Sequence, residues 1–421
     1  MVIKREQASK INSSVFILIC IWFCMPKVQV VTGKTFLFLL LISWIVTADW
    51  NCLFKSISWN KWFLVWYIYM LLLLILGVWE YGLSGASSFF IDVPLFFLGA
   101  LIFSYYKAID NNILLGKGCM VSLFCILIGS LNSIFKLLQY PMASRILATG
   151  SMESKEYAQM GIGGYSYVYA SVMIMVSVIY LLKTKKSVSI RYKTFLLILY
   201  IVNFIFIIKA SYTIAIIFAI FLSAISLISF KNLKWLMLIG VISSVLIIIF
   251  RAQVGYFLII IANNLPQGLA SYGKILDFAQ GLTSNNFGSE TINRLDLYMK
   301  SVNCFFNSPL FGRIWSNNTE YAIGNHSTWF DLLGAFGLIG SLPIFIFIIL
   351  KFKNMIKLWN HNDYGNYIVI ILLYVSIFGF INPIISAYEF GFILFLLVPS
   401  FPYIIYANEQ KEDKVEENEH L

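Results

Sequence analysis

Apolar segments of roughly twenty residues, each long enough to cross a bilayer as one α-helix, recur along almost the whole chain. They constrain the fold more than any other feature of the sequence. Of all residues, 60% are hydrophobic and 12% are charged, which leaves too little polar surface for a soluble domain. The sequence therefore predicts an all-α polytopic membrane protein with about twelve transmembrane helices.

The expected spans form one integral membrane domain that covers 1–421. Their approximate boundaries are 13–32, 35–52, 62–79, 88–106, 118–136, 163–182, 194–209, 212–229, 234–250, 328–350, 365–382 and 386–406. The tightest connection is the hairpin at 209–212. Because more spans follow the first one, we expect the first to remain as an anchor and not to be cleaved as a signal peptide.

The net charge of +10 is arranged as in a multi-pass membrane protein and not as in a nucleic-acid-binding face. Cations gather at 183–193 and again at 351–357, which predicts that both connections are cytoplasmic. The N-terminus and the charged tail at 407–421 are then cytoplasmic as well. Two long connections on the outer side, 137–162 and 251–327, carry many cations against this rule, so we expect them to serve the function.

The six cysteines show no spacing that indicates a disulfide framework or a metal site. Cys304 lies alone in the large outer loop, and the others fall in or beside spans. The sequence gives no reason to expect a metal or a cofactor.

The large outer loop, 251–327, is expected to be partly helical. Its apolar run at 256–261 is too short to span a membrane, so it is either re-entrant or lies on the membrane surface. Further along, apolar residues recur at steps of three and four, which predicts an amphipathic helix that ends at 307–309. Those residues are Ile292, Leu295, Met299, Val302 and Phe305.

Arg294 is expected in the first turn of that helix, where the helix dipole opposes a cation by about 0.3–1 kcal/mol. An anion near Arg294 would offset this cost. This anion is Glu290, a lipid headgroup or the diphosphate of a substrate. Arg313, which follows a turn at 309–312, is a weaker candidate of the same kind.

The smaller outer loop, 137–162, carries Arg145 and leads into a span through a run of glycines and tyrosines. The rings of Tyr165 and Tyr167 could stack on sugars, whereas helix packing and an interfacial aromatic belt are the alternative explanation. At the next outer hairpin, Lys209 either snorkels to the surface or points into an outward cavity.

His326, one of three histidines, stands where the large loop meets a span. Thr328 and Asp331 form a capping-box pattern, which predicts that a helix begins near Thr328. The positive end of the helix dipole then disfavours a charged imidazole and attracts anions. A neutral histidine beside a phosphate site is what a transferase acting on lipid-linked phosphates would need.

Within the spans, Gly334, Gly337 and Gly340 predict close packing of the helix that follows His326. Asp92 and Glu389 are carboxylates at span depth, a placement that suggests function. Hydration near the outer boundary would also account for Asp92. Glu389 is either an alternative base or a structural partner of an arginine.

The order of these features resembles the O-antigen ligase and polymerase superfamily, most closely the Wzy-type polymerases of O-antigen and capsule repeat units. The resemblance covers most of the chain in topology and is specific at 291–343, where His326 is followed by Leu-x-x-x-Gly-Leu-Ile-Gly; it is weaker at 145–167. One departure stands out: relatives often carry Ser-Arg at the hairpin where this chain has Ser211 and Tyr212. Lys209 is the candidate for the missing charge.

The resemblance implies a class C glycosyltransferase-like fold that works without metal or cofactor on the outer face of the bacterial inner (plasma) membrane. Arg145 and Arg294 match the arginines that bind the diphosphate of undecaprenyl-diphosphate-linked glycans, and His326 matches the catalytic histidine. A separate chain-length regulator is a further partner that this class implies. The alternatives are an O-antigen ligase, which transfers finished glycan to a lipid acceptor, and a flippase for the same lipid-linked sugars.

Overall fold

The computed structural model describes residues 5–81, 86–149, 151–184, 189–227, 250–264, 289–313, 323–360 and 363–405, with short pieces at 272–273, 275–276, 279–280 and 283. All regular secondary structure in these residues is helical. The chain is therefore an all-α protein over its described part.

Eight described helices are long and apolar enough to cross a membrane. They make the chain a polytopic membrane protein by length and composition. These segments are Glu6–Cys24, Pro26–Val46, Ile91–Ala108, Asn112–Gln139, Tyr165–Lys183, Ile190–Lys209, Thr328–Trp359 and Tyr364–Ile381. Shorter apolar helices cover Lys61–Leu73, Thr213–Leu227, Ala252–Asn263 and Tyr388–Ser400, and the expected span at 234–250 lies outside the described residues.

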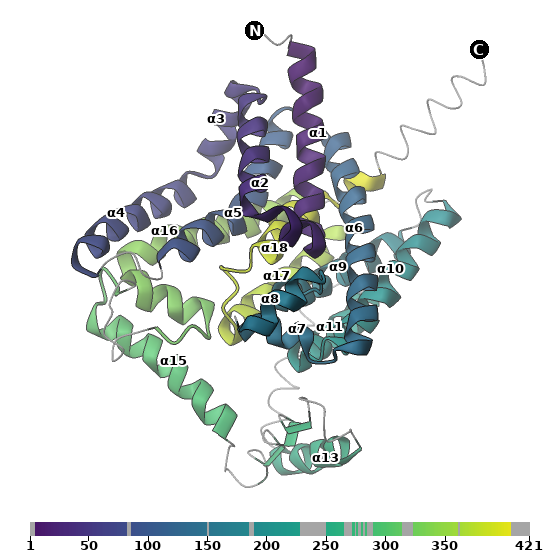
Figure 1. The fold of residues 1–421 in the computed structure, drawn as a ribbon, viewed down its shortest axis with the longest axis vertical. Coiled ribbons are helices and arrows are strands. Elements are labelled where there is room, and N and C mark those ends of the chain that lie inside the picture. The colour runs from purple at the N-terminus through teal and green to yellow at the C-terminus, as the bar shows by residue number, and fades with distance from the viewer. Residues whose placement is uncertain are drawn as a thin grey trace.

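The helices follow one another closely along the chain (Figure 1). The first half contains α1 (Arg5–Cys24), α2 (Pro26–Val46), α3 (Trp50–Trp59), α4 (Lys61–Tyr81), α5 (Ala86–Ala108), α6 (Asn112–Gln139), α7 (Ala143–Ile146), α8 (Met152–Gln159), α9 (Tyr165–Lys183) and α10 (Ile190–Lys209). The second half contains α11 (Thr213–Leu227), α13 (Arg251–Asn263), α15 (Ser289–Asn307), α16 (Thr328–Trp359), α17 (Tyr364–Ile381), α18 (Tyr388–Phe392), a π-helical segment (Ile393–Leu397) and α19 (Val398–Ser400).

The most deeply buried helices occupy the middle of the bundle. α9 is lined almost entirely by buried side chains, and so is the segment from Phe390 to Ile405. α5 and α9 pack against α18, α10 and α11 pack against α9, and α16 packs against α4, α15 and α17. In Figure 1, α7, α8 and α15 lie toward the lower end of this bundle, and α1 begins at its upper end.

The expected first span, 13–32, is wrong because the chain breaks at Met25. Met25 adopts an extended conformation, φ −127° and ψ 95°, and Pro26 then begins α2. Proline disfavours helical geometry in the residue before it and suits the first turn of the next helix. α2 also bends at Gly33, where φ is 68°, and it ends at Val46, so the expected span at 35–52 is shifted as well.

Both expected outer loops contain helices. The smaller one folds into α7, a short 3₁₀ turn at Leu147–Thr149, and α8. In the larger one the amphipathic helix is present as α15, but it begins at Ser289. Arg294 therefore lies in the second turn and not the first, so the expected conflict with the dipole of the first turn does not arise.

α16 begins at Thr328, as the sequence predicts, although the residue that caps it is Ser327. The Ser327 side chain accepts from the Phe330 amide, and the Asp331 carboxylate in turn accepts from the Ser327 amide at 3.0 Å. The capping residue is thus one position earlier than the expected Thr328, while Asp331 is the carboxylate that accepts in return, as expected.

Candidate functional site

Arg145 lies in α7, at the end of the bundle where α9 begins. Its guanidinium stands over the ring of Tyr212, with 5.9 Å between the guanidinium carbon and the ring centroid. The Tyr212 hydroxyl donates to the Ser144 carbonyl at 2.9 Å. Arg145 Nη1 is buried and has no hydrogen-bond partner among the described residues. A buried cationic donor without an acceptor is costly, and an anionic ligand would satisfy it.

Tight backbone contacts fix α7 against the start of α9. Ser144 Oγ donates to the Gly163 carbonyl at 2.7 Å, and the Gly163 amide donates to Ser133 Oγ at 2.8 Å. A β-carbon at Gly163 would come within 2.6 Å of the Tyr167 ring and 2.8 Å of the Phe206 ring. The glycine is therefore required for this close approach, which sets the position of Arg145 relative to α9.

Three tyrosines from two segments form a cluster beside Arg145, which we call the tyrosine cluster: Tyr165, Tyr169 and Tyr212. The ring centroids of Tyr165 and Tyr169 lie 4.9 Å apart, and those of Tyr169 and Tyr212 lie 5.7 Å apart. The Tyr165 hydroxyl is buried and, like Arg145 Nη1, has no hydrogen-bond partner among the described residues. The cluster therefore presents two unsatisfied polar groups.

Arg294 of α15 lies within electrostatic range of the same cluster, although no hydrogen bond or ring contact joins them among the described residues. Its charge acts on the hydroxyls of Tyr165 and Tyr169, and the charge of Arg145 acts on those of Tyr169 and Tyr212. The two arginines singled out from the sequence are thus brought to one group of tyrosines. The side chain of Glu290, the expected alternative partner of Arg294, lies outside the described side chains.

Tyr167 is not part of the tyrosine cluster. It is 2% exposed, and its hydroxyl donates to the Ile126 carbonyl at 3.0 Å inside the bundle. The run of glycines and tyrosines in the sequence did not show which of these side chains would be buried at the first turn of α9. Of the two expected sugar-contacting tyrosines, only Tyr165 borders the site.

The turn that carries His326 is held in place by buried hydrogen bonds. The Asp331 carboxylate accepts from Ser301 Oγ at 2.5 Å and from the Asn325 amide at 3.2 Å, and it also accepts from the Ser327 amide. Asn325 adopts a left-handed conformation with φ 56°. These contacts fix where the imidazole leaves the chain.

His326 Nδ1 lies 3.2 Å from the Gly324 carbonyl oxygen. When Nδ1–H donates to that carbonyl, Nε2 is left as the nitrogen that can accept a proton. Among the described residues the ring makes no hydrogen bond to Arg145 or Arg294. The histidine is therefore oriented by its own turn and not by the arginines.

α15 connects the His326 turn with the tyrosine cluster. The Tyr298 hydroxyl donates to the Ile381 carbonyl at 3.3 Å, and the Tyr298 ring lies 6.2 Å from that of Phe330, in the first turn of α16. One face of α15 thus carries Arg294 and Tyr298 between the two groups.

The other two cations singled out from the sequence, Arg313 and Lys209, lie outside the tyrosine cluster. The Arg313 amide donates to the Gly334 carbonyl at 3.0 Å, and the charge of this side chain acts on the Cys304 thiol. Lys209 is exposed at the end of α10. Neither side chain has a described contact with the tyrosine cluster.

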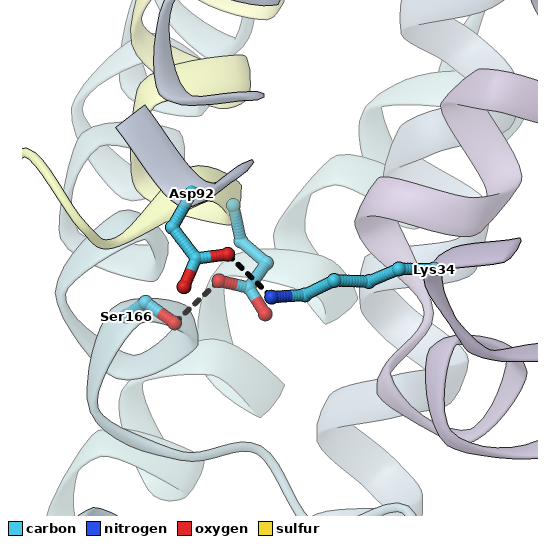
Figure 2. Close-up of polar contacts among 4 residues, drawn as sticks. Lys34, Asp92 and Ser166 are labelled. Atoms are coloured by element: carbon cyan, nitrogen blue, oxygen red, sulfur yellow. Dashed lines mark hydrogen bonds and ion pairs between the residues drawn. The ribbon is translucent and has the colours of Figure 1, made fainter. Parts of the chain in front are cut away.

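A second polar group, which we call the ion cluster, joins four helices: Lys34 of α2, Asp92 of α5, Ser166 of α9 and Glu389 of α18 (Figure 2). Lys34 forms an ion pair with Asp92, and Ser166 Oγ donates to Glu389 Oε2 at 2.6 Å. The Lys34 ammonium also lies 5.4 Å from the centroid of the Tyr388 ring. One carboxylate is therefore paired with an ammonium and the other with a hydroxyl, next to the first turn of α9.

The sequence singled out Asp92 and Glu389 but missed Lys34 and Ser166. The Asp92 carboxylate is paired with an ammonium and not merely hydrated, and the hydrogen-bond donor to Glu389 is a serine and not an arginine. The available signal was a lysine eight residues after Pro26 in an apolar helix, since unpaired charges are rarely tolerated there.

Among the described residues, no group of three or more His, Cys, Asp or Glu side chains could hold a metal ion. The fold and the candidate spans define the class as polytopic α-helical membrane protein. No family model matches the chain. A search of curated proteins also finds no match.

Proposed function

We propose that this protein is a glycosyltransferase that joins undecaprenyl-diphosphate-linked oligosaccharide repeat units into O-antigen or capsular polysaccharide. It would act at the outer face of the bacterial plasma membrane, with a class C glycosyltransferase-like arrangement of about twelve spans. The observation that carries the proposal is Arg145, whose buried Nη1 has no hydrogen-bond partner among the described residues and whose guanidinium stands over Tyr212, with Arg294 within electrostatic range of the same tyrosines. Two guanidinium groups at one place suit a diphosphate, since each binds phosphate oxygens through paired N–H donors.

In this mechanism the acceptor is the next lipid-linked repeat unit. A hydroxyl of that unit attacks the anomeric carbon of the growing glycan, and the bond between this carbon and the diphosphate oxygen breaks. The electron pair leaves with undecaprenyl diphosphate, and the hydroxyl proton passes to Nε2 of His326. General-base catalysis of this kind contributes about 10²–10⁴ in rate.

Arg145 and Arg294 bind the diphosphate and stabilise the charge that develops on it as the bond breaks. A charge-assisted hydrogen bond contributes roughly 1.5–3 kcal/mol to binding, and donors aligned with the developing charge lower the barrier further. Tyr165 borders the arginines with an unsatisfied hydroxyl, which suits a contact with the first sugar of the donor.

The test supplies purified protein in vesicles with lipid-linked repeat units and follows glycan length on a gel. We expect wild type to form a ladder, and we expect Arg145→Gln, Arg294→Gln and His326→Ala to reduce it by at least tenfold. Lys155→Ala is the control, because this exposed lysine of α8 has no described contact with the site. Full polymer formation by all three variants would rule out the assignment.

Cells that lack the protein separate the polymerase from its alternatives. Loss of a polymerase leaves single repeat units on the surface lipid, whereas loss of a ligase removes all units from it. Loss of a flippase traps the units inside the cell. We expect the first pattern.

A carrier of lipid-linked glycans is the second candidate, and the ion cluster is the observation that favours it. Charged groups inside a helix bundle commonly mark ion or substrate pathways. If the protein were a carrier, vesicles containing it would translocate lipid-linked units without lengthening them, and Lys34→Met would stop that translocation.

A further inference from the structure

A cleft of about 560 Å³ lies between the start of α2, the last turns of α6, and α8. This volume is in the range of small-ligand sites. Its polar side chains are Lys27, Asn132, Lys136, Glu156 and Gln159, and Met25, Ile128 and Met160 supply apolar walls. None of these residues belongs to the candidate site around Arg145.

The two lysines of the cleft differ in how they are held. Lys27 Nζ donates to the Gln159 carbonyl at 2.5 Å, which ties the start of α2 to the end of α8. The Lys136 ammonium has neither an ion-pair nor a hydrogen-bond partner among the described residues, although it is only partly exposed. The cleft therefore contains an ammonium group that is available to an anion.

Asn132 also lines the cleft. Its side-chain amide donates to the carbonyls of Met160 and Gly161, at 3.0 and 2.9 Å. These bonds anchor the connection between α8 and α9 on α6. This part of the lining is thus held in place by two hydrogen bonds.

One wall of the cleft continues into an exposed apolar stripe on α6. Ile128, which lines the cleft, is 51% exposed and belongs to this stripe. The stripe recurs at steps of three and four residues and consists of Phe124, Ile128, Leu131, Phe135 and Leu138. On a spanning helix such a stripe faces acyl chains.

We propose that this cleft binds the phosphate headgroup of an anionic membrane lipid, with the acyl chains along the stripe of α6. Lys27 lies in the first turn of α2 and Lys136 in the last turn of α6, so both ammonium groups lie at helix ends. Helix ends of spanning segments are where lipid phosphates lie. A soluble anion would use the lysines but would leave the apolar wall unoccupied. The proposal does not depend on the proposed function.

The experiment titrates fluorescent phosphatidylglycerol into the full-length protein purified in a neutral detergent. We expect saturable binding by wild type and roughly tenfold weaker binding by Lys136→Met, as expected for one charge-assisted contact. Lys136→Arg should keep most of the affinity, because it retains the charge. Lys155→Met is the matched control for loss of one positive charge outside the cleft, and it should bind as wild type does.

Three competitors identify the ligand. Unlabelled phosphatidylglycerol should displace the probe, whereas zwitterionic phosphatidylcholine and millimolar inorganic phosphate should not. Wild-type affinity in Lys136→Met, or displacement of the probe by inorganic phosphate alone, would overturn the proposal. Since Lys136 has no described contact to lose, unchanged elution of the variant on size exclusion is expected and separates loss of binding from misfolding. If Lys136→Met misfolds, the comparison of Lys136→Arg with Lys136→Gln decides: equal affinities contradict the proposal.

Discussion

Gly337 provides the sharpest test of how the His326 helix is built. It interrupts α16 with φ 60° and ψ −166°. The turn formed by Pro309, Leu310 and Phe311 enters at this break, where the Leu338 amide donates to the Pro309 carbonyl at 2.8 Å and the Ile339 amide donates to the Leu310 carbonyl at 3.1 Å. The glycine is therefore a junction between the turn at 309–312 and α16, and not only a small residue for helix packing.

Gly337→Ala should destabilise the protein in two ways. A positive φ costs a residue with a β-carbon about 1–2 kcal/mol. The new β-carbon would also lie 2.4 Å from the Leu310 carbonyl carbon and 2.6 Å from the Phe311 amide nitrogen. Because these are backbone atoms, the clash can be relieved only by displacing the turn. Displacing that turn removes two hydrogen bonds of about 0.5–1.5 kcal/mol each. The expected loss is therefore roughly 2–5 kcal/mol in the free energy of unfolding.

Gly33→Ala is the matched control. Gly33 has φ 68°, but a β-carbon there would meet nothing within 4 Å, so this variant carries the conformational cost alone. Unfolding followed in detergent should show a loss of about 1–2 kcal/mol for Gly33→Ala and a clearly larger loss for Gly337→Ala. Equal losses would refute the argument that the turn at 309–312 is wedged into α16.

Three further predictions concern the polar groups. Lys34→Met leaves the Asp92 carboxylate without its ion-pair partner. Because the Lys34 side chain is 38% exposed, we expect the free energy of unfolding to fall by about 1–3 kcal/mol and not by the full cost of breaking a buried pair. Lys34→Arg should remain close to wild type in thermal unfolding. Asp331→Ala removes the acceptor that holds the His326 turn, so stability should fall by about 1.5–3 kcal/mol and glycan length in the vesicle assay should fall with it; an unchanged ladder would contradict this role. Burial raises the pKa of the Cys304 thiol above 9.0, so the folded state disfavours the thiolate and stability should decline as the pH rises past 9. Cys304→Ala should show a smaller decline between pH 8 and pH 10 in the same unfolding measurement, and an equal decline would exclude this thiol as its source.

Local patterns in the sequence predict some elements well. The three- and four-residue spacing of apolar residues at 292–305 gives α15, and the polar residues before the apolar run place the start of α16 at Thr328. Both signals come from residues that are close together in the sequence, so they can be recognised without knowledge of the fold. The break at Met25 had a local signal too, Pro26, but the average hydrophobicity of 13–32 concealed it.

Features created by tertiary contacts could not be predicted in the same way. Nothing near Asp92 in the sequence points to Lys34, because the pair forms only when α2 meets α5. Arg145 and Arg294 were candidates, yet the residue that supports Arg145 is Tyr212, which stood out in the sequence only as a departure from the resembling family. Which face of α9 each tyrosine occupies likewise follows from packing, and it places Tyr167 in the core.

The most direct test of the proposed site is the affinity of the purified protein for undecaprenyl diphosphate in wild type, Arg145→Gln, Arg294→Gln and the double variant. Each single change should weaken binding by roughly 10- to 150-fold, the equivalent of 1.5–3 kcal/mol. The double variant should lose less than the product of the two effects if both guanidinium groups hold the same diphosphate. Unchanged affinity in both single variants, or independent effects that multiply fully, would contradict a shared diphosphate site.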